Sequence, residues 1–165
     1  MREYKHMAYT LAMRVLRLRE DAEEVTQDAF VKAYQKLPGY TGASKFSTWL
    51  YSIVYHAAIS KLRARRAGTM DLDEVAETFL VPQETHVPDE QDRKRALELA
   101  LSRLPAEDAA VVSLFYFSEQ SVEEIVTATG LSASNVKVKL HRSRKKLFEV
   151  LQDQLKEELW TLQEG

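Results

Sequence analysis

Hydrophobic residues recur at helical spacing along most of the chain, and no stretch alternates apolar and polar residues as a half-buried strand would. In the first part of the chain the pattern predicts helices over residues 3–18, 21–37 and 46–66. Residues 38–42, Pro-Gly-Tyr-Thr-Gly, break the pattern before the third helix. Further on it predicts a helix over 92–104, and Pro105 favours the start of another because it fixes the first turn. The sequence therefore predicts an all-α protein.

The last third of the chain has the pattern of a helix-turn-helix. Ser121 can cap a short helix, Gly130 can end it in a left-handed turn, and Ser132 can cap a second helix. Apolar residues at helical spacing are expected to pack inward: Ile125, Leu131, Val136, Leu140 and Leu147. The second helix then carries cations outward: Lys137, Lys139, Arg142, Arg144, Lys145 and Lys146. A bare basic run is usually a solvated face, but a capped and supported helix favours DNA binding.

The net charge of −2 conceals a segregation of charge along the chain. Residues 1–67 contain 12 Lys or Arg and 6 Asp or Glu, and residues 93–147 contain 10 and 6. Residues 68–92, between these basic blocks, contain 8 acidic residues and no Lys or Arg. We therefore expect two small helical domains, at 1–67 and 93–150, joined by an acidic linker at 68–92 and followed by an acidic helical tail at 151–165.

Several classes of chemistry have no support in the sequence. The chain has no cysteine, and its four histidines are scattered without ligand spacing, so we expect no structural metal and no cofactor. No nucleophile–base set and no phosphate-cradling glycine loop is present, so we expect no enzymatic activity. No apolar run is long enough to span a bilayer, and the N-terminus lacks the apolar core of a signal peptide, which predicts a cytoplasmic protein.

The second predicted helix has an acidic and amide face opposite its apolar residues. That face contains Asp21, Glu24, Gln27, Asp28 and Gln35, and the apolar positions are Ala22, Val25, Ala29, Ala33 and Leu37. Amphipathic packing explains the apolar positions. It does not explain why negative charge gathers inside a basic block, and a basic protein partner would.

The third predicted helix carries a polar stripe that includes an aromatic residue: Lys45, Trp49, Ser52, His56 and Arg63. We expect Phe46, Leu50, Ile53 and Ala57 to face a core. Lys61, Arg63, Arg65 and Arg66 gather at the end of the helix. Cations that hold phosphates, beside Tyr40, Trp49 and Tyr51 that could stack on bases, suit single-stranded or opening DNA. The alternative is that the aromatic residues belong to the core.

Four motifs in this order resemble the bacterial RNA polymerase sigma factors of the extracytoplasmic-function (ECF) type, regions 2 and 4. They are the segments 21–34, DAEEVTQDAFVKAY, 46–53, FSTWLYSI, 101–105, LSRLP, and 121–147, which contains SVEEI and VKVKLHRSRKKL. Three positions depart from the usual residues of the family, since Tyr55-His56 replaces Arg-Asn and Ala109 replaces an arginine. The first helix also begins later than is usual, which indicates either altered packing of region 2 or a trimmed start.

The resemblance implies an alternative sigma factor that directs promoter recognition, DNA melting and transcription initiation. It implies binding to the β′ clamp helices of core RNA polymerase through Asp21, Glu24, Gln27, Asp28 and Val31, and a contact with the β flap. For the −10 promoter element it implies Tyr40, Lys45, Trp49, Ser52, His56, Arg63, Arg65 and Arg66. For the −35 element it implies Ser134, Lys137, Val138, Lys139, His141, Arg142 and Lys145. An anti-sigma factor is a further implied partner.

Two other interpretations of the residues stay open at this stage. A self-sufficient helix-turn-helix regulator would bind duplex DNA as a dimer without polymerase. A helical interaction module would never contact DNA and would use both basic blocks for solubility only. Strong salt dependence of DNA binding would argue against it.

Overall fold

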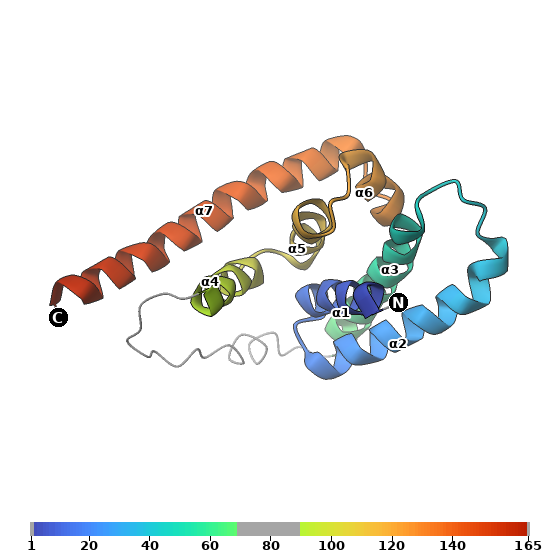
Figure 1. The fold of residues 1–165 in the computed structure, drawn as a ribbon, viewed down its shortest axis with the longest axis horizontal. Coiled ribbons are helices and arrows are strands. Elements are labelled where there is room, and N and C mark those ends of the chain that lie inside the picture. Colours follow the sequence, from blue (N-terminus) through green and yellow to red (C-terminus); the bar gives the residue numbers. More distant parts are fainter. Residues whose placement is uncertain (1, 69–89, 165) are drawn as a thin grey trace.

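The computed structural model describes residues 2–68 and 90–164, and every regular element within these residues is helical (Figure 1). The all-α prediction is therefore confirmed. The N-terminal half consists of α1 (Arg2–Leu16), α2 (Arg19–Lys36), the 3-10 turn η1 (Leu37–Gly39) and α3 (Phe46–Gly68). The C-terminal half consists of α4 (Glu90–Ser102), α5 (Ala106–Val112), the π-helical turn η3 (Ser113–Phe117), α6 (Val122–Thr129) and α7 (Ala133–Glu164). The linker expected at 68–92 lies largely outside the described residues, and the described residues at its two ends are helical.

The N-terminal helices α1, α2 and α3 pack against one another. The face that α2 buries contains mostly small residues, Ala22, Val25, Ala29 and Ala33, as the pattern predicts. Small side chains let neighbouring helices approach closely, and this brings the acidic face of α2 near the basic end of α3. Leu37 was also expected in the core, but it is 46% exposed because the chain tightens into the turn η1 around Pro38.

The buried face of α3 differs from the predicted one. Leu50 is buried as expected, whereas Ile53 and Ala57 are only partly buried and Phe46 is exposed. Tyr51 and Tyr55 are buried instead, and the Tyr51 hydroxyl contacts the Met7 sulfur at 3.2 Å. The expectation that Tyr51 could stack on bases is therefore wrong. The physical reason is that α3 is covered by the helices α1 and α2 and also by α6.

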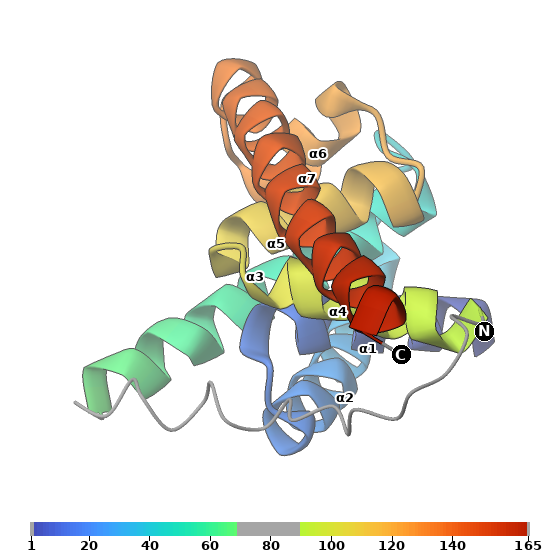
Figure 2. The ribbon, with the colours of Figure 1, turned by 90° about the vertical axis from the view of Figure 1, so that its left-hand side faces the viewer.

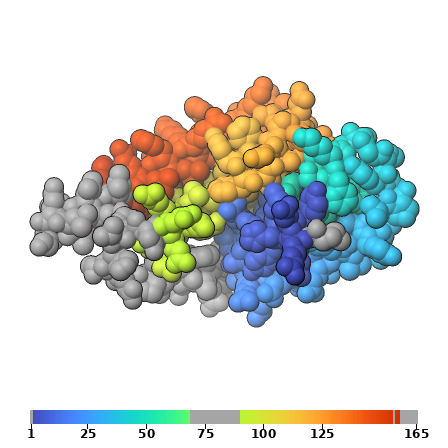
Figure 3. Space-filling model, in the orientation of Figure 1, coloured from blue at the N-terminus to red at the C-terminus, as the bar shows by residue number. Residues whose placement is uncertain are grey.

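The two halves pack directly on each other and share one hydrophobic core (Figures 1 and 2). Helix α6 lies against α3 and α5 lies against α1, and the space-filling view shows the α6 region directly beside α3 (Figure 3). At the α3–α6 contact the buried Thr48 hydroxyl donates to Gln120 Oε1 at 2.6 Å, and Lys45 Nζ lies 3.2 Å from Glu124 Oε2. Arg14 of α1 also pairs with Glu98 of α4 at 2.7 Å.

The predicted helix-turn-helix is confirmed in its local geometry. Ser121 and Glu124 form a reciprocal capping box at the start of α6. Gly130 ends this helix in the left-handed region with φ of 78°, where a residue without Cβ is favoured. Ser132 then caps α7 by accepting the backbone N–H of Asn135 at 3.1 Å. Figure 1 shows that α7 is one long helix, so the recognition segment continues into the tail without a break.

Candidate nucleic-acid interface

The start of α7 presents an exposed polar and basic face. Val136 and Leu140 are buried on the side toward α5 and α6, and this fixes which residues point to solvent. The residues on the opposite side are Ser134, Lys137, Val138, His141 and Lys145, which share one face at helical spacing. Val138 is 58% exposed although it is apolar. A side chain of this kind can contact a thymine methyl group in the major groove.

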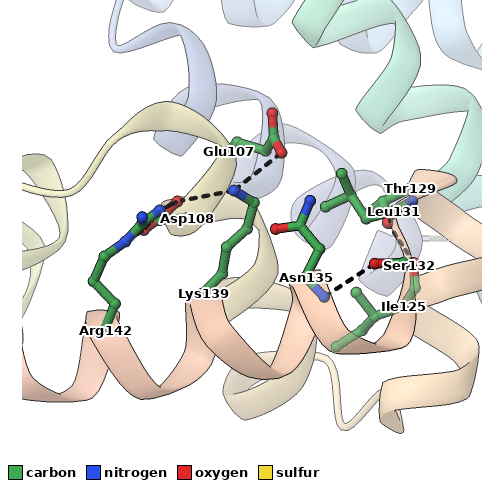
Figure 4. A network of polar contacts seen from close by, with 9 residues as sticks. All are labelled: Glu107, Asp108, Ile125, Thr129, Leu131, Ser132, Asn135, Lys139 and Arg142. Atoms are coloured by element: carbon green, nitrogen blue, oxygen red, sulfur yellow. Dashed lines mark hydrogen bonds and ion pairs between the residues drawn. The ribbon is translucent and has the colours of Figure 1, made fainter.

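The two other predicted residues of α7 are paired with acids of α5. Arg142 makes a two-pronged contact with Asp108, and Lys139 Nζ lies 3.3 Å from Glu107 and 3.7 Å from Asp108 (Figure 4). The Lys139 side chain is only 13% exposed, so it does not share the solvent face with Lys137. Sequence reasoning missed Asp108, although an acid directly before the apolar run 109–112 can signal a buried carboxylate that needs a partner.

The predicted −10 residues form an exposed or half-exposed strip along α3 and the loop before it. Lys45, His56, Arg63 and Arg66 are exposed, and Tyr40, Trp49 and Ser52 are partly buried. Trp49 stands in an aromatic cluster with ring centroids 5.0 Å from Tyr40 and 5.7 Å from Phe46. The Tyr40 hydroxyl donates to the Ser44 carbonyl at 2.5 Å, which ties the loop to this cluster. Trp49 is thus neither a core residue nor a freely moving one.

Cations at the end of α3 contact acids that the sequence assigned to polymerase binding. Arg65 Nη1 lies 2.9 Å from Asp21, and its Nη2 donates to the Leu16 carbonyl at 2.9 Å. Lys61 pairs with Glu24 at 3.2 Å. Arg65 is therefore held between α1 and α2 rather than projecting with Arg63 and Arg66.

The acidic face of α2 is exposed as predicted, at Glu24, Gln27, Asp28 and Val31. Two apolar residues that sequence reasoning did not include are exposed near it, Tyr34 (80%) and Leu37. Val31, Tyr34 and Leu37 follow one another at intervals of three residues. This helical spacing is the signal that could have identified Tyr34 and Leu37. Exposed apolar residues gathered in one place are typical of a surface that binds another protein.

A groove separates the end of α3 from α5 and α7. It is lined by cations of both predicted DNA-binding sets, Arg63 and Arg66 on α3 and Lys139 and Arg142 on α7, together with Glu107 and Asp108. Nearby, burial raises the pKa of the Tyr55 hydroxyl to about 12, and Glu107 adds to this rise. That hydroxyl therefore stays protonated at neutral pH.

Arg17 is a further residue of the contact between the halves that the sequence did not indicate. Its guanidinium donates to the Leu104 carbonyl, across from α1 to the segment before α5. Burial lowers the pKa of this guanidinium, and Arg66 and Arg65 lower it further. The backbone of Arg17 has φ of 60°, a left-handed conformation that a residue with a side chain adopts only at some cost.

Other site types find no support in the part of the chain that the structure describes. Residues 2–68 and 90–164 contain no cluster of acids and histidines that could hold a metal ion. None of their helices is both long enough and apolar enough to cross a membrane.

The fold and its exposed cations define a helical DNA-binding protein with a helix-turn-helix in its C-terminal half. Similarity to known proteins identifies the family within this class. Residues 1–68 match the family model for sigma-70 region 2, and residues 94–147 match that for sigma-70 region 4. The chain is 35% identical over 133 residues to the RNA polymerase sigma factor YlaC of Bacillus subtilis, covering 78% of this chain and 76% of that protein. The chain belongs to the RNA polymerase sigma factors of the ECF type, and it directs transcription initiation as an alternative sigma factor.

Two further similarities agree with this assignment. The chain is 29% identical over 162 residues to the ECF RNA polymerase sigma factor SigW of Bacillus subtilis, covering 91% of this chain and 86% of that protein. Its fold is similar to that of the sigma factor RpoE of Bartonella quintana, solved in complex with the anti-sigma factor NepR. The TM-score is 0.69 at 24% identity, over 90% of this chain and 92% of the other, and this similarity concerns the fold.

Proposed function

We propose that α2 binds core RNA polymerase through the face that contains Asp21, Glu24, Gln27, Asp28 and Val31, with the β′ clamp helices as its partner. The support is an exposed acidic surface beside exposed apolar residues, Val31 and Tyr34. Charge would favour a basic partner, and burial of the apolar residues would stabilise the complex. Region 4 would contact the β flap.

The strip along α3 would bind the −10 element in its opened form. The residues are Tyr40, Lys45, Trp49, Ser52, His56, Arg63 and Arg66, together with Arg65 once it is released from Asp21. The aromatic cluster around Trp49 supports this role, because a partly exposed ring held by its neighbours can stack on an unpaired base at little entropic cost. Exposed Arg63 and Arg66 would hold the phosphates.

The start of α7 would bind the −35 element in the major groove through Ser134, Lys137, Val138, Lys139, His141, Arg142 and Lys145. The exposed face of α7 is the single observation that carries the proposed function, because it places most of these residues together on a helix held by α5 and α6. Phosphate contacts would orient the protein, and a few side chains would select bases. The protein would act by binding, without catalysis, in the cytoplasm.

Promoter binding would require the two halves to separate. The −10 and −35 elements lie about 25 base pairs apart, which is about 85 Å at about 3.4 Å per base pair. Yet Thr48 of α3 and Gln120 beside α6 are joined by a 2.6 Å hydrogen bond in the shared core. The packed arrangement is therefore a form that precedes promoter binding. An anti-sigma factor that stabilises it would keep the protein inactive.

Run-off transcription with core polymerase on promoter libraries tests this function. We expect a promoter-dependent transcript that is lost with Asp28→Arg through lower core affinity. Lys137→Ala should weaken use of the −35 element, and Trp49→Ala should impair DNA opening more than closed-complex binding. Absence of any promoter-dependent transcript would reject the proposal. A specific shift of duplex DNA without polymerase would favour the self-sufficient regulator.

A crosslink tests the separation of the halves. The chain contains no cysteine, so Lys45→Cys and Glu124→Cys introduce the only thiols, on side chains now paired across the contact. Joining them with a short bismaleimide should abolish run-off transcription. The matched control is the same double variant capped with a monofunctional maleimide, which carries the same two substitutions and should keep clearly more activity than the crosslinked protein. Equal activity of the crosslinked and the capped protein would contradict the required separation.

A further inference from the structure

Asp108 is a buried carboxylate at the contact between α5 and α7. Its side chain is only 2% exposed, and both of its oxygens face Arg142. Arg142 Nε donates to Oδ2 at 3.0 Å, while Nη2 lies 2.9 Å from Oδ1 and 2.8 Å from Oδ2 (Figure 4). Lys139 lies on the other side of the carboxylate, 3.7 Å from Oδ1.

The contact occupies one edge of the Arg142 guanidinium and leaves another edge available. Asp108 accepts hydrogen bonds from Nε–H and from one hydrogen of Nη2. Both hydrogens of Nη1 and the outer hydrogen of Nη2 therefore remain free to donate. The Arg142 side chain is 56% exposed, which makes those donors accessible. Two parallel N–H groups of this kind match O6 and N7 of guanine in the major groove, the commonest specific contact between proteins and DNA.

The pair is expected to persist when DNA binds. A carboxylate buried as deeply as Asp108 is strongly destabilised if its partner leaves, unlike an exposed one. An approaching phosphate therefore cannot draw Arg142 away at low cost. It can draw Lys137, which is exposed and has no ion-pair partner among the described residues. Arg142 thus meets DNA in a fixed orientation, whereas Lys137 is free to follow the nearest phosphate.

We propose that Asp108 is a positioning residue for recognition of the −35 element. It presents the free edge of Arg142 to one guanine, and together with Glu107 it holds Lys139 away from the bases, so that Lys139 contributes to DNA binding through its charge rather than through a base contact. This inference rests on the proposed function, in which α7 binds the −35 element. Asp108 on α5 would then influence which base is selected without contacting DNA itself.

The test measures competitive binding of promoters by the full chain assembled with core polymerase, with each −35 base pair varied in turn. The variants are Asp108→Asn, Arg142→Ala and the double variant. Wild type should prefer guanine at one position. Asp108→Asn and Arg142→Ala should each reduce that preference about tenfold. The double variant should reduce it no further than either substitution alone. The control Lys137→Ala should weaken all sequences alike and lower the salt slope by about one.

A purely structural role for Asp108 gives a different result. Asp108→Asn would then weaken every promoter equally, or its effect would add to that of Arg142→Ala, and either outcome overturns the proposal. All variants are compared at a temperature where circular dichroism shows them folded. If Asp108→Asn does not fold, Arg142→Lys replaces it, because lysine keeps the charge but cannot contact Asp108 and guanine with paired donors. Retained preference in that variant would equally overturn the proposal.

The same measurements distinguish the role of α7 from the role of Asp108. If wild type binds all −35 sequences alike, the proposed function of α7 is wrong. If wild type discriminates and Asp108→Asn discriminates equally well, only the role of Asp108 is wrong.

Discussion

The two basic regions of the molecule neutralise their cations in different ways. At the end of α3, Lys61 and Arg65 pair with Glu24 and Asp21, whose side chains are exposed or partly exposed. At the start of α7, Arg142 pairs with Asp108, a carboxylate almost fully removed from water. Exposed pairs contribute little to stability and exchange partners readily, whereas a buried acid holds its cation.

If α2 binds polymerase as proposed, this difference would make the two regions respond differently to it. The acids that hold the α3 cations belong to the surface proposed to bind polymerase, so binding of polymerase would compete for Asp21 and Glu24 and release Arg65 and Lys61 toward DNA. The acid that holds Arg142 lies on α5 and is almost fully buried. The α3 region would then respond to polymerase, and the α7 region would keep one geometry throughout.

The largest expected effect is that of Arg142→Ala on stability. Removing the guanidinium leaves the buried Asp108 carboxylate with Lys139 alone, at 3.7 Å. The expected loss is about 2–3 kcal/mol in the free energy of unfolding, measured by urea denaturation followed by circular dichroism. The control Lys137→Ala removes an exposed cation of the same helix and should cost under about 0.5 kcal/mol. If both substitutions lowered the free energy of unfolding equally, the pair between Arg142 and the buried Asp108 would contribute no more to stability than an exposed cation.

A smaller effect is expected for Asp21→Asn at the end of α3. The pair with Arg65 is partly buried at 2.9 Å, so its loss should cost about 1 kcal/mol. The substitution leaves the Arg65 contact with the Leu16 carbonyl in place. Glu20→Gln, in the same first helical turn but exposed, controls for the helix dipole. A loss as large as that for Arg142→Ala would remove the contrast between the two regions.

The helix-turn-helix could be predicted from the sequence because its signals are local. Ser121, Gly130 and Ser132 act on backbone groups within a few residues of themselves, and the structure confirms all three. The buried stripe of α2 followed from helical periodicity in the same way. Leu37 was misplaced because Pro38 changes the geometry at the helix end.

The remaining features could not be predicted because they depend on distant segments. Tyr51 and Tyr55 are buried partly because α6 covers α3, and periodicity within α3 does not contain that information. Asp108 could be recognised as an unusual acid, but its partner Arg142 lies 34 residues away. The exposed candidates of α7 were predictable from spacing, whereas the inward position of Lys139 was not.

Glu124 of α6 forms a contact with Lys45, just before α3, whose strength should depend on pH. The backbone N–H of Ser121 lowers the pKa of its carboxyl below the ordinary value of 4.5, and Lys45 lowers it further. A lowered folded-state pKa contributes stability above pH 4.5 that is lost as the pH falls through the folded value. Glu124→Gln should therefore destabilise slightly at pH 7 and reduce the additional loss seen at acid pH. Glu123→Gln, next to it in the first turn of α6 but without an ion pair in the described residues, is the matched control for removing a carboxylate at this position.

The smallest stability effect is expected for the exposed pair between Lys61 and Glu24. Both side chains are more than a third exposed, so solvent screens their 3.2 Å contact, and Glu24→Gln should change stability by less than about 0.5 kcal/mol. Its effect should appear instead in polymerase affinity, measured by competition for core enzyme at low and at moderate salt. Lys61→Ala is the matched control, because it breaks the same pair and leaves the acidic face intact. If both substitutions weakened core binding equally, the ion pair itself rather than the Glu24 carboxylate would be the polymerase contact, and the proposed release of α3 cations would be wrong.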